Sequence, residues 1–485
     1  MNFKTTLLFT LILPLLIFSS CKKDETLLDT SAKLQFSTDS VLFDTVFTHV
    51  GSTTKQFKIY NNYKQKLTIS KIHLATGSAS AYRINVDGIA GTTINDIEIL
   101  GGDSLYVFVQ VTINPTNQNS PLLIKDSIVF EINGNLQDVK LIAIGQDVYL
   151  HKPDHFPTNG FPPYSITGRE HFDTILPNDK PHLFFGYTII DSDCKTTIQA
   201  GTKLYFHKGA VLMVFDDGTI NVKGAPGNAV VFQGDRLEPE FKELAGQWGK
   251  IWLSRKSKNN TIDWAIIKNG SIGVQADTLG VSPNPTLTIT NTIVKNMTAA
   301  AIYGQGTYIK GFNCVFANCG QYVAALILGG KYKFEQCTFA NYRNGATPTT
   351  PLLVMNNYYT SGNNLYVRPL DSAYFGNCIL YGSAAEEIVL DSFDAGGSFF
   401  SYKFDHCILK TNLDTTNDIE HYNVVYKNQD PGFKDIENND YQLTQNSFAI
   451  GMGNPMINIS KDLNNQNRPN PIGSNPDLGA YEYYP

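Results

Sequence analysis

The sequence predicts an all-β protein with two folded parts, an immunoglobulin-like β-sandwich followed by a parallel β-helix. Three observations predict this. A short motif recurs at intervals of 22 and 23 residues in the C-terminal part, and short alternating strand-like runs fill the N-terminal part. The composition, with 17% charged residues, 12% aromatic residues and 39 glycines, is typical of a β-rich, secreted protein.

The recurring motif is clearest between Leu287 and Tyr342. It reads N-T-I-V-K-N-M, N-C-V-F-A-N-C and Q-C-T-F-A-N-Y, and it closes at Asn296, Asn318 and Asn341. A period in the low twenties with irregular insertions is typical of a solenoid, and each coil can hold three strands of about 4–5 residues. Val, Ile, Thr, Tyr and Phe favour strands, helical repeats have longer periods, and leucine-rich spacing is absent. We therefore expect a parallel β-helix; the alternative is a β-sandwich with Asn turns at chance spacing.

Aligning the repeats places similar residues in columns that stack from coil to coil. A turn position, mostly an amide, opens each motif, a large apolar residue precedes it by two positions, and a small residue follows it. These columns are Trp264, Asn291, Asn313, Gln336, Asn377 and His406; Ile262, Ile289, Phe334, Phe375 and Phe404; and Ala265, Thr292, Cys314, Cys337, Cys378 and Cys407. We expect left-handed turns in the first column and buried, reduced cysteines in the third. Asn296, Asn318 and Asn341 are expected to form a structural ladder in which stacked amides hydrogen-bond one another.

The first 31 residues have the features of a targeting segment and a tether. Lys4 precedes an apolar run, Leu7 to Phe18, which is too short to span a bilayer and leads into F-S-S-C, ending at Cys21. This resembles the lipobox of bacterial lipoproteins, although Phe18 stands where Leu is usual. The resemblance implies a signal peptide over 1–20, lipidation of Cys21 and a tether over 21–31, so that a lipid anchor holds the protein to a membrane. The alternative is an ordinary secretory signal.

Charged residues follow the predicted lipidation site. The run K-K-D-E over 22–25 resembles the export signal that sends Bacteroidota lipoproteins to the outer face of the outer membrane. The resemblance implies a surface-exposed, outer-membrane location, and the alternative is a solvated linker.

Residues 32–150 contain alternating strand-like runs separated by turn residues, of which Tyr106 to Val111 is an example. About seven such runs predict an immunoglobulin-like sandwich, and the segment Ala32 to Asp147 contains no Cys. F-D-T-V-F, K-Q-F-K-I-Y-N and G-D-S-L-Y-V-F-V resemble the abnormal-spindle/Hydin-type immunoglobulin modules of Bacteroidota surface proteins. The resemblance implies a spacer or binding platform without catalytic residues.

The remaining chain is predicted to contain a linker or cap over 151–184, the β-helix over 185–460 and a C-terminal cap over 461–485. The run Thr197 to Ala210, the strand G-Q-W-G-K-I-W-L and the closing D-L-G-A-Y-E resemble right-handed β-helix lipoproteins of the pectin-lyase-like superfamily. The resemblance implies a right-handed parallel β-helix. Phe448 and Gly451 depart from the usual S-P-A-I-D pattern, so an Asp is missing there.

Catalytic residues of the β-helix enzymes are not recognisable in the sequence. Hydrolysis of a glycoside needs two facing carboxylates, and elimination needs bound calcium beside a base. Asp216 and Asp217 precede Gly218 as turn residues would, and Arg368 with Asp371 lacks a second Arg and a calcium cluster. No metal or cofactor is expected. A net charge of −6 and the lack of a binding motif also argue against nucleic acid as a partner.

Aromatic residues and an acidic insertion are the best candidates for ligand contacts. Trp264 and Trp248 lie in the coils and would stack on sugar rings if exposed. Asp235 and Glu243 bound a polar insertion at a corner of the solenoid, where binding faces often form. The sequence therefore predicts a monomeric, lipid-anchored cell-envelope protein that binds glycans or glycan-bearing surfaces without catalysis. The alternatives are a polysaccharide lyase or glycoside hydrolase with an unrecognised site, and a structural spacer.

Overall fold

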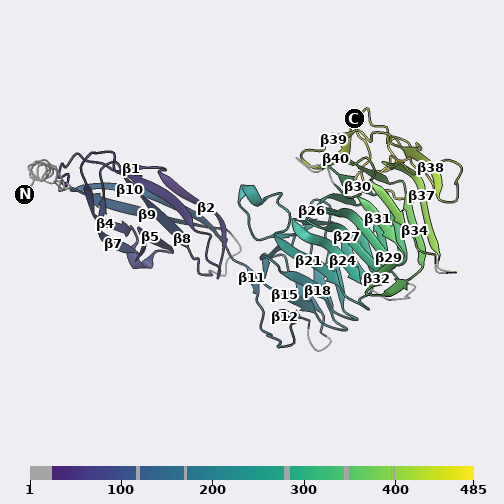
Figure 1. Cartoon of the computed structure of the whole chain (residues 1–485), viewed down its shortest axis with the longest axis horizontal. Helices are drawn as coiled ribbons and strands as arrows, with labels where there is room; N and C mark the ends of the chain where they lie inside the picture. The colour runs from purple at the N-terminus through teal and green to yellow at the C-terminus, as the bar shows by residue number, and fades with distance from the viewer. Residues whose placement is uncertain are drawn as a thin grey trace, which may run out of the picture. The chain divides into compact units, whose positions relative to one another are not determined.

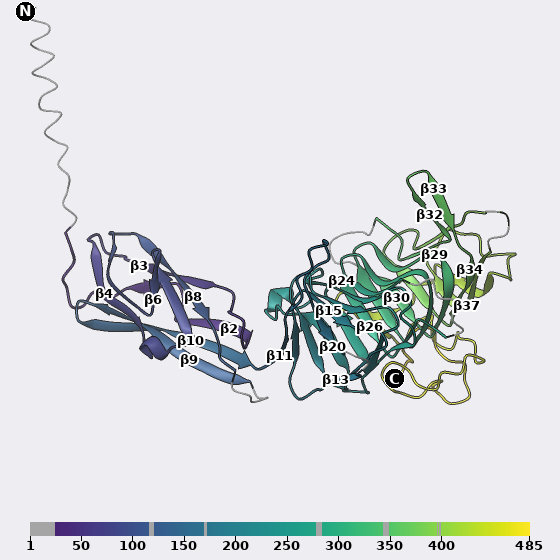
Figure 2. The same ribbon diagram turned by 90° about the horizontal axis from the view of Figure 1, so that it is seen from below.

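The computed structural model describes residues 25–115, 121–168, 172–277, 284–342, 349–394, 396 and 399–485. The chain forms two compact units, Met1–Asp147 and Val148–Pro485, and the described residues of both are almost entirely strands and turns (Figures 1 and 2). Among these residues, no helix is long and apolar enough to cross a membrane. The predicted signal peptide and Cys21 lie outside the described residues.

The N-terminal unit is a β-sandwich of two five-stranded sheets, which confirms the immunoglobulin-like prediction. One sheet has the order β1 (Gln35–Phe36), β3 (Lys55–Tyr60), β8 (Ser104–Val111), β5 (Tyr82–Val86) and β6 (Ile89–Gly91). The other has the order β2 (Ser40–Phe47), β10 (Asn135–Gln146), β9 (Leu122–Ile132), β4 (Leu67–Leu74) and β7 (Thr93–Ile99). In β8, Val107, Val109 and Val111 are buried between the sheets, as the alternating pattern predicts.

The C-terminal unit is a right-handed parallel β-helix, as predicted, and its strands stack into three sheets. Sheet A contains β12 (Tyr164–Thr167), β15 (Tyr187–Ile190), β18 (Val211–Val214), β21 (Trp248–Leu253), β24 (Gly270–Asp277), the first part of β27 (Ala300–Phe312) and of β29 (Tyr322–Glu335), β31 (Leu353–Asn356) and β36 (Ile388–Asp391). All these neighbours pair in parallel, which is the arrangement that a coiled chain must produce.

Sheets B and C complete each coil. Sheet B contains β11 (Tyr149–His151), β14 (His182–Phe184), β17 (Lys203–Phe206), β20 (Val230–Gly234), β23 (Ala265–Lys268), β26 (Ile293–Met297), β28 (Val315–Cys319), β30 (Thr338–Asn341), β35 (Ile379–Gly382), the end of β37 (Phe400–Leu409) and the end of β38 (Tyr422–Lys427). Sheet C contains β13 (Thr174–Leu176), β16 (Lys195–Ile198), β19 (Thr219–Lys223), β22 (Asn260–Asp263), β25 (Leu287–Thr290), the second part of β27 and of β29, β34 (Leu370–Gly376), and the start of β37 and of β38.

The predicted columns coincide with the strand register. Phe334, Phe375 and Phe404 are register partners, and their rings follow one another at 5.5 and 5.1 Å in the core. The six turn-column residues, from Trp264 to His406, all have φ between 49° and 53°. All six described cysteines are buried, and the four of the predicted column, Cys314, Cys337, Cys378 and Cys407, form no disulfide.

Two segments differ from the expected boundaries. Strands β11, β12 and β13 lie within the expected linker or at its edge and pair in register with β14, β15 and β16, so the segment over 151–184 belongs to the first coil of the solenoid. After β38 the chain turns back and packs against the outer face of sheet B, where Tyr441, Leu463 and Ala480 contact Val315 and Ala340. The segment 428–485, which includes the hairpin β39 (Phe433–Asp435) and β40 (Asp440–Leu443), therefore covers the side of the solenoid as well as closing the chain.

Candidate functional site

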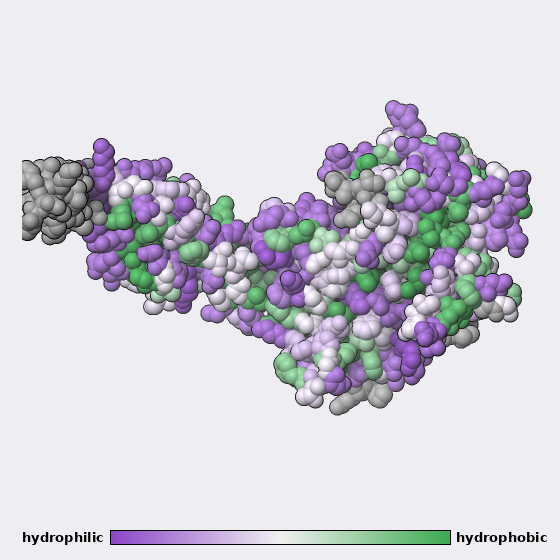
Figure 3. Space-filling model, viewed as in Figure 1, coloured by the Kyte–Doolittle hydropathy of each residue, from purple (hydrophilic) through white to green (hydrophobic). Residues whose placement is uncertain are grey.

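Trp252, Gln275 and Tyr303 occupy matched positions on β21, β24 and β27, three neighbouring strands of sheet A. The flanking residues Ile251 and Leu253 are fully buried in the core, so the alternation of a strand directs Trp252 to the outer face. Figure 1 shows these strands side by side, and Figure 3, from the same direction, shows apolar and polar surface interleaved on this side of the molecule.

A hydrogen-bonded network fixes the polar side chains around Trp252. The Trp252 Nε1–H donates to Asp277 Oδ2 at 2.7 Å, and Gln275 Nε2 donates to both Asp277 carboxylate oxygens at 2.9 Å. Lys250 Nζ donates to Gln275 Oε1 at 2.6 Å and lies 4.5 Å from the centroid of the Trp252 ring. Burial lowers the pKa of Lys250, and the nearby Asp277 opposes that shift. We call Lys250, Trp252, Gln275, Asp277 and Tyr303 the sheet A platform.

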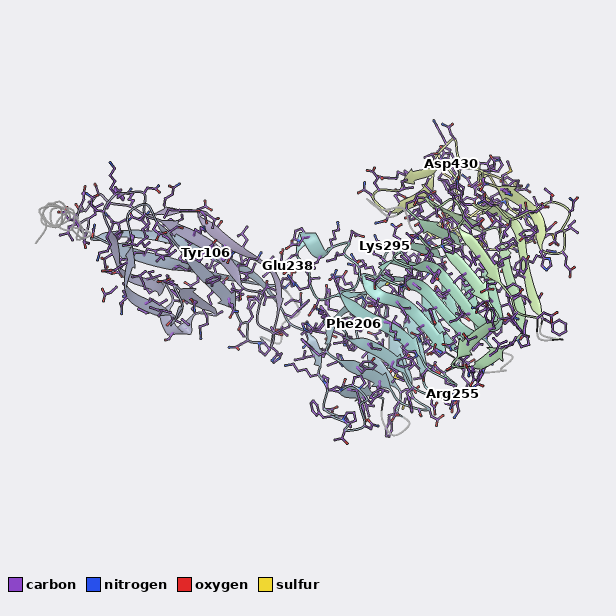
Figure 4. All side chains as sticks on the ribbon, in the orientation of Figure 1. Tyr106, Phe206, Glu238, Arg255, Lys295 and Asp430 are labelled. Atoms are coloured by element: carbon purple, nitrogen blue, oxygen red, sulfur yellow. The ribbon has the colours of Figure 1, made fainter. Side chains whose placement is uncertain are left out.

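The surroundings of the platform make it a distinct part of the sheet. On the preceding coils, Ile189, Val211 and Met213 are buried beneath Phe161 and Tyr164, and this cluster reaches the edge of Trp252. Insertions leave the solenoid at both edges of sheet A. The acidic insertion that contains Glu238 enters β21, whereas Arg255 lies in the turn that leaves it, and Figure 4 labels both residues. Beyond them, the hairpin β32 (Tyr358–Ser361) and β33 (Asn364–Val367) projects from the same edge as Arg255.

The prediction that Trp248 contacts a ligand is wrong, because this residue is buried in the core. Only 1% of its surface is exposed, and its ring stacks on Phe206 with 4.4 Å between centroids. Its indole N–H donates to the Lys268 carbonyl at 2.8 Å. Trp248 is the first residue of β21 and is buried, whereas Trp252 lies between the buried Ile251 and Leu253 further along the same strand and is partly exposed.

Asp235 and Glu243 fasten the acidic insertion to sheet B. Asp235 pairs with His207 at 2.7 Å, and burial raises the pKa of its carboxyl group. Glu243 lies 2.9 Å from Lys295 Nζ and accepts a hydrogen bond of 2.5 Å from Asn296 Nδ2. Both carboxylates therefore have intramolecular partners. Glu243, which was predicted to contact a ligand, bonds Asn296, which was predicted to belong to the amide ladder.

Trp264 lies at a separate hollow of about 460 Å³ on sheet B. Val231, Ile266 and Ile293 line this hollow, together with Asn228, Asn291, Asn464 and Tyr481. Trp264 has φ 51°, a left-handed conformation that is uncommon for a bulky residue and disfavoured by about 1–2 kcal/mol. The missing Cβ of Gly224 makes room for this turn, because a Cβ there would lie 1.9 Å from the Trp264 carbonyl oxygen.

Asn296, Asn318 and Asn341 lie at equivalent positions of successive coils, but their amides do not bond one another. Asn318 Nδ2 donates to Asn439 of the C-terminal segment, and its Oδ1 accepts from the Tyr342 N–H at 3.0 Å. Asn341 Oδ1 accepts from the Cys319 N–H at 3.2 Å. The expected amide ladder is therefore wrong for these residues, because Nδ2 of Asn296 and of Asn318 donates to a distant side chain and Nδ2 of Asn341 has no hydrogen-bond partner among the described residues. A direct contact of the expected kind joins Asn313 and Asn291 in the neighbouring column, at 3.2 Å.

The acidic residues considered for catalysis are dispersed. Asp216 and Asp217 pair with Lys256 and Lys258 at 3.6 and 3.0 Å, at the corner between sheets A and C. Asp371 lies several coils away in β34. In the described part of the chain, no group of three or more His, Cys, Asp or Glu side chains is placed to hold a metal ion.

The residues of the sheet A platform were not predicted as ligand contacts from the sequence. Trp252, Gln275 and Tyr303 are 23 and 28 residues apart, so the repeat period could have aligned them. The signal was weak because the three residues share no residue type.

The sequence matches no known family model, and no curated protein matches it significantly. Among solved structures, the chain is similar to the catalytic unit of the thermostable GH87 α-1,3-glucanase from Streptomyces thermodiastaticus strain HF3-3. That match has 8% identity and a TM-score of 0.25, and it covers 77% of this chain and 66% of that chain. The ASH/PapD-like domain of human CEP192 matches with 10% identity and a TM-score of 0.18, over 24% of this chain and 89% of that one. The E. coli chaperone DraB matches with 8% identity and a TM-score of 0.17, over 23% of this chain and 54% of that one.

Proposed function

We propose that this protein is a glycan-binding protein of the bacterial cell envelope, and that the sheet A platform contacts the sugar. The observation that carries the proposal is an outward-facing indole whose N–H and neighbouring polar groups are already fixed by hydrogen bonds. An aromatic ring supplies an apolar surface for the C–H face of a pyranose, while adjacent amides, ammonium groups and carboxylates pair with its hydroxyl groups.

Fixed geometry favours binding because little side-chain freedom is lost when the ligand arrives. Gln275 donates to Asp277 and accepts from Lys250, so the remaining donors of Lys250 keep a defined direction. Tyr303 adds a second ring two coils beyond Trp252, about 9.6 Å further along the solenoid. A chain of sugars that runs along the solenoid axis would meet Trp252 and Tyr303 in succession.

We also propose that Cys21 carries a lipid and that the protein is displayed on the outer membrane of a Bacteroidota species. The lipobox-like F-S-S-C run and the charged K-K-D-E run that follows it support this assignment. Two or more acyl chains give stable attachment, whereas one gives marginal attachment.

Binding to a glycan array, followed by affinity measurements with the best oligosaccharide, tests the glycan proposal. Trp252→Ala is expected to reduce affinity about tenfold or more, as loss of a central aromatic contact does. Trp264→Ala, at the hollow on sheet B, is the matched control and should leave that affinity unchanged. If Trp264→Ala lost affinity and Trp252→Ala kept it, the binding site would be the hollow on sheet B and not the sheet A platform. Release of new reducing ends or unsaturated products from a bound glycan would contradict the non-catalytic role.

A further inference from the structure

A row of lysines on the outer face of sheet C carries more positive charge than the described structure neutralises. Strand register places Lys310 of β27 directly beside Lys333 of β29, and Tyr374 of β34 lies between Lys333 and Lys403 of β37. Lys331 of β29 lies beside Tyr308. We call Lys310, Lys331, Lys333 and Lys403 the lysine column.

The four charges are unequally compensated. Lys333 pairs with Glu335 at 2.9 Å. Among the described residues, Lys310, Lys331 and Lys403 form no ion pair with a carboxylate. Asp371 is exposed and lies in the register shift between Leu370 and Ser372, so it has no register partner on β29. Like charges on adjacent strands repel, so an unneutralised lysine column weakens the sheet unless an anion lies across it.

Aromatic rings alternate with these lysines. The Nζ atoms of Lys310 and Lys331 lie 5.4 and 5.0 Å from the centroid of the Tyr308 ring, so two ammonium groups flank one ring. Lys333 Nζ lies 5.8 Å from the centroid of the Phe312 ring. Tyr308, Phe312 and Tyr374 are partly exposed. Cation–π contacts hold the ammonium groups beside apolar ring surfaces. An acidic sugar can use both, because its anionic group pairs with an ammonium group and its ring packs against an aromatic ring.

We propose that the lysine column binds an anionic polysaccharide, a sugar polymer bearing carboxylate or sulfate groups, along the solenoid axis. Coils repeat about every 4.8 Å, so Lys310, Lys333 and Lys403 present positive charges in a line, and Lys331 lies beside that line. A single line fits one polymer chain better than the plane of head groups at a lipid surface. The chain as a whole carries a net charge of −6 and lacks the broad basic field of nucleic-acid-binding proteins. This surface is on a different sheet from the platform, and the proposal does not depend on the function proposed for sheet A.

Dextran sulfate and unmodified dextran provide matched probes, because they share a backbone and differ in charge. The double substitution Lys310→Gln/Lys331→Gln is expected to lower affinity for dextran sulfate about tenfold, and added salt should weaken wild-type binding. Lys256→Gln/Lys258→Gln is the matched control, because it removes the same charge from lysines that Asp216 and Asp217 already neutralise. Trp252→Ala should bind dextran sulfate normally, which keeps this test separate from that of the sheet A platform.

Three results would overturn the proposal. They are equal binding of dextran and dextran sulfate, an equal loss of affinity in the two double variants, and binding of a single-stranded DNA oligonucleotide as tight as that of dextran sulfate. The last result would identify the surface as a general polyanion or nucleic-acid site. Circular dichroism and thermal unfolding of both double variants verify that the substitutions leave the fold intact.

Discussion

Replacing Arg468 tests how the C-terminal segment is held on sheet B. The Arg468 and Glu482 side chains are 1% and 0% exposed, and Arg468 Nε lies 3.1 Å from Glu482 Oε2. The same guanidinium donates to Asn313 Oδ1 at 2.6 Å, which joins the segment to the turn column, and to the Gly479 carbonyl at 3.1 Å. Asp462 and Asp477 lie close enough to Arg468 to stabilise its charge.

We expect Arg468→Met to lower the free energy of unfolding of the β-helix by about 3–5 kcal/mol, because it leaves a buried carboxylate without its partner. Thermal unfolding measures the loss, and limited proteolysis followed by mass spectrometry should show new cleavage within 428–485. Lys258→Gln, which removes an exposed ion pair, is the control and should cost at most about 1 kcal/mol.

The effect of Arg468→Met should also depend on pH. Burial already raises the pKa of Glu482 and of Asp477, while Arg468 opposes the shift. Without the guanidinium both pKa values rise further. When the folded-state pKa of a carboxyl group is raised, the free energy of unfolding of the protein falls as pH rises from the unfolded-state pKa to the folded-state pKa. The stability of the variant should therefore be closer to that of the wild type at pH 5 than at pH 8. An unchanged melting temperature, or unchanged proteolysis of 428–485, would refute the view that this ion pair holds the segment.

Three further predictions concern a buried acid, the core and the lipid. Glu387 is fully buried and accepts the Ala384 and Leu352 N–H groups, and burial raises its pKa to about 7. The free energy of unfolding should therefore fall as pH rises from about 4.5 to 7, by at most about 3 kcal/mol. Glu387→Gln should remove this part of the pH dependence in thermal unfolding, and a variant whose stability depends on pH as steeply as that of the wild type would contradict the assignment. Phe375→Ala should cost about 3–5 kcal/mol in the same assay, because it empties the middle of the ring stack, and a cost below about 1 kcal/mol would argue against close packing there. Cys21→Ser should shift the protein from the membrane fraction to the soluble fraction, and unchanged partitioning would exclude lipid attachment at Cys21.

The repeated positions of the β-helix could be predicted because each coil imposes the same local demands. The turn column is an example, since Asn291, Asn313 and Asn377 mark a left-handed corner that Asn tolerates better than most residues. Trp264 at the same position was recognisable only through this alignment. The apolar column was equally predictable, because one interior position recurs in every coil.

Contacts between distant segments could not be predicted from the repeat. Asn318 bonds Asn439, which is 121 residues away, and Asn313 bonds Arg468, which is 155 residues away. Nothing in the period shows that the chain returns along sheet B after β38, so these partners replaced the expected amide ladder. The sheet A platform was missed for a related reason, because Trp252, Gln275 and Asp277 become neighbours only once the strand register and its bulge are known.

Fluorescence of Trp252 during glycan titration tests the proposed function most directly. The chain has three tryptophans, so Trp264→Phe leaves the buried Trp248 and the outward-facing Trp252. Trp248 is shielded from a soluble quencher, and quenching by acrylamide therefore reports on Trp252. We expect an oligosaccharide selected on the array to protect the indole from quenching and to shift its emission to shorter wavelength, with a midpoint equal to the dissociation constant. Saturating glycan binding with unchanged quenching and emission would contradict the assignment of the sheet A platform as the binding site.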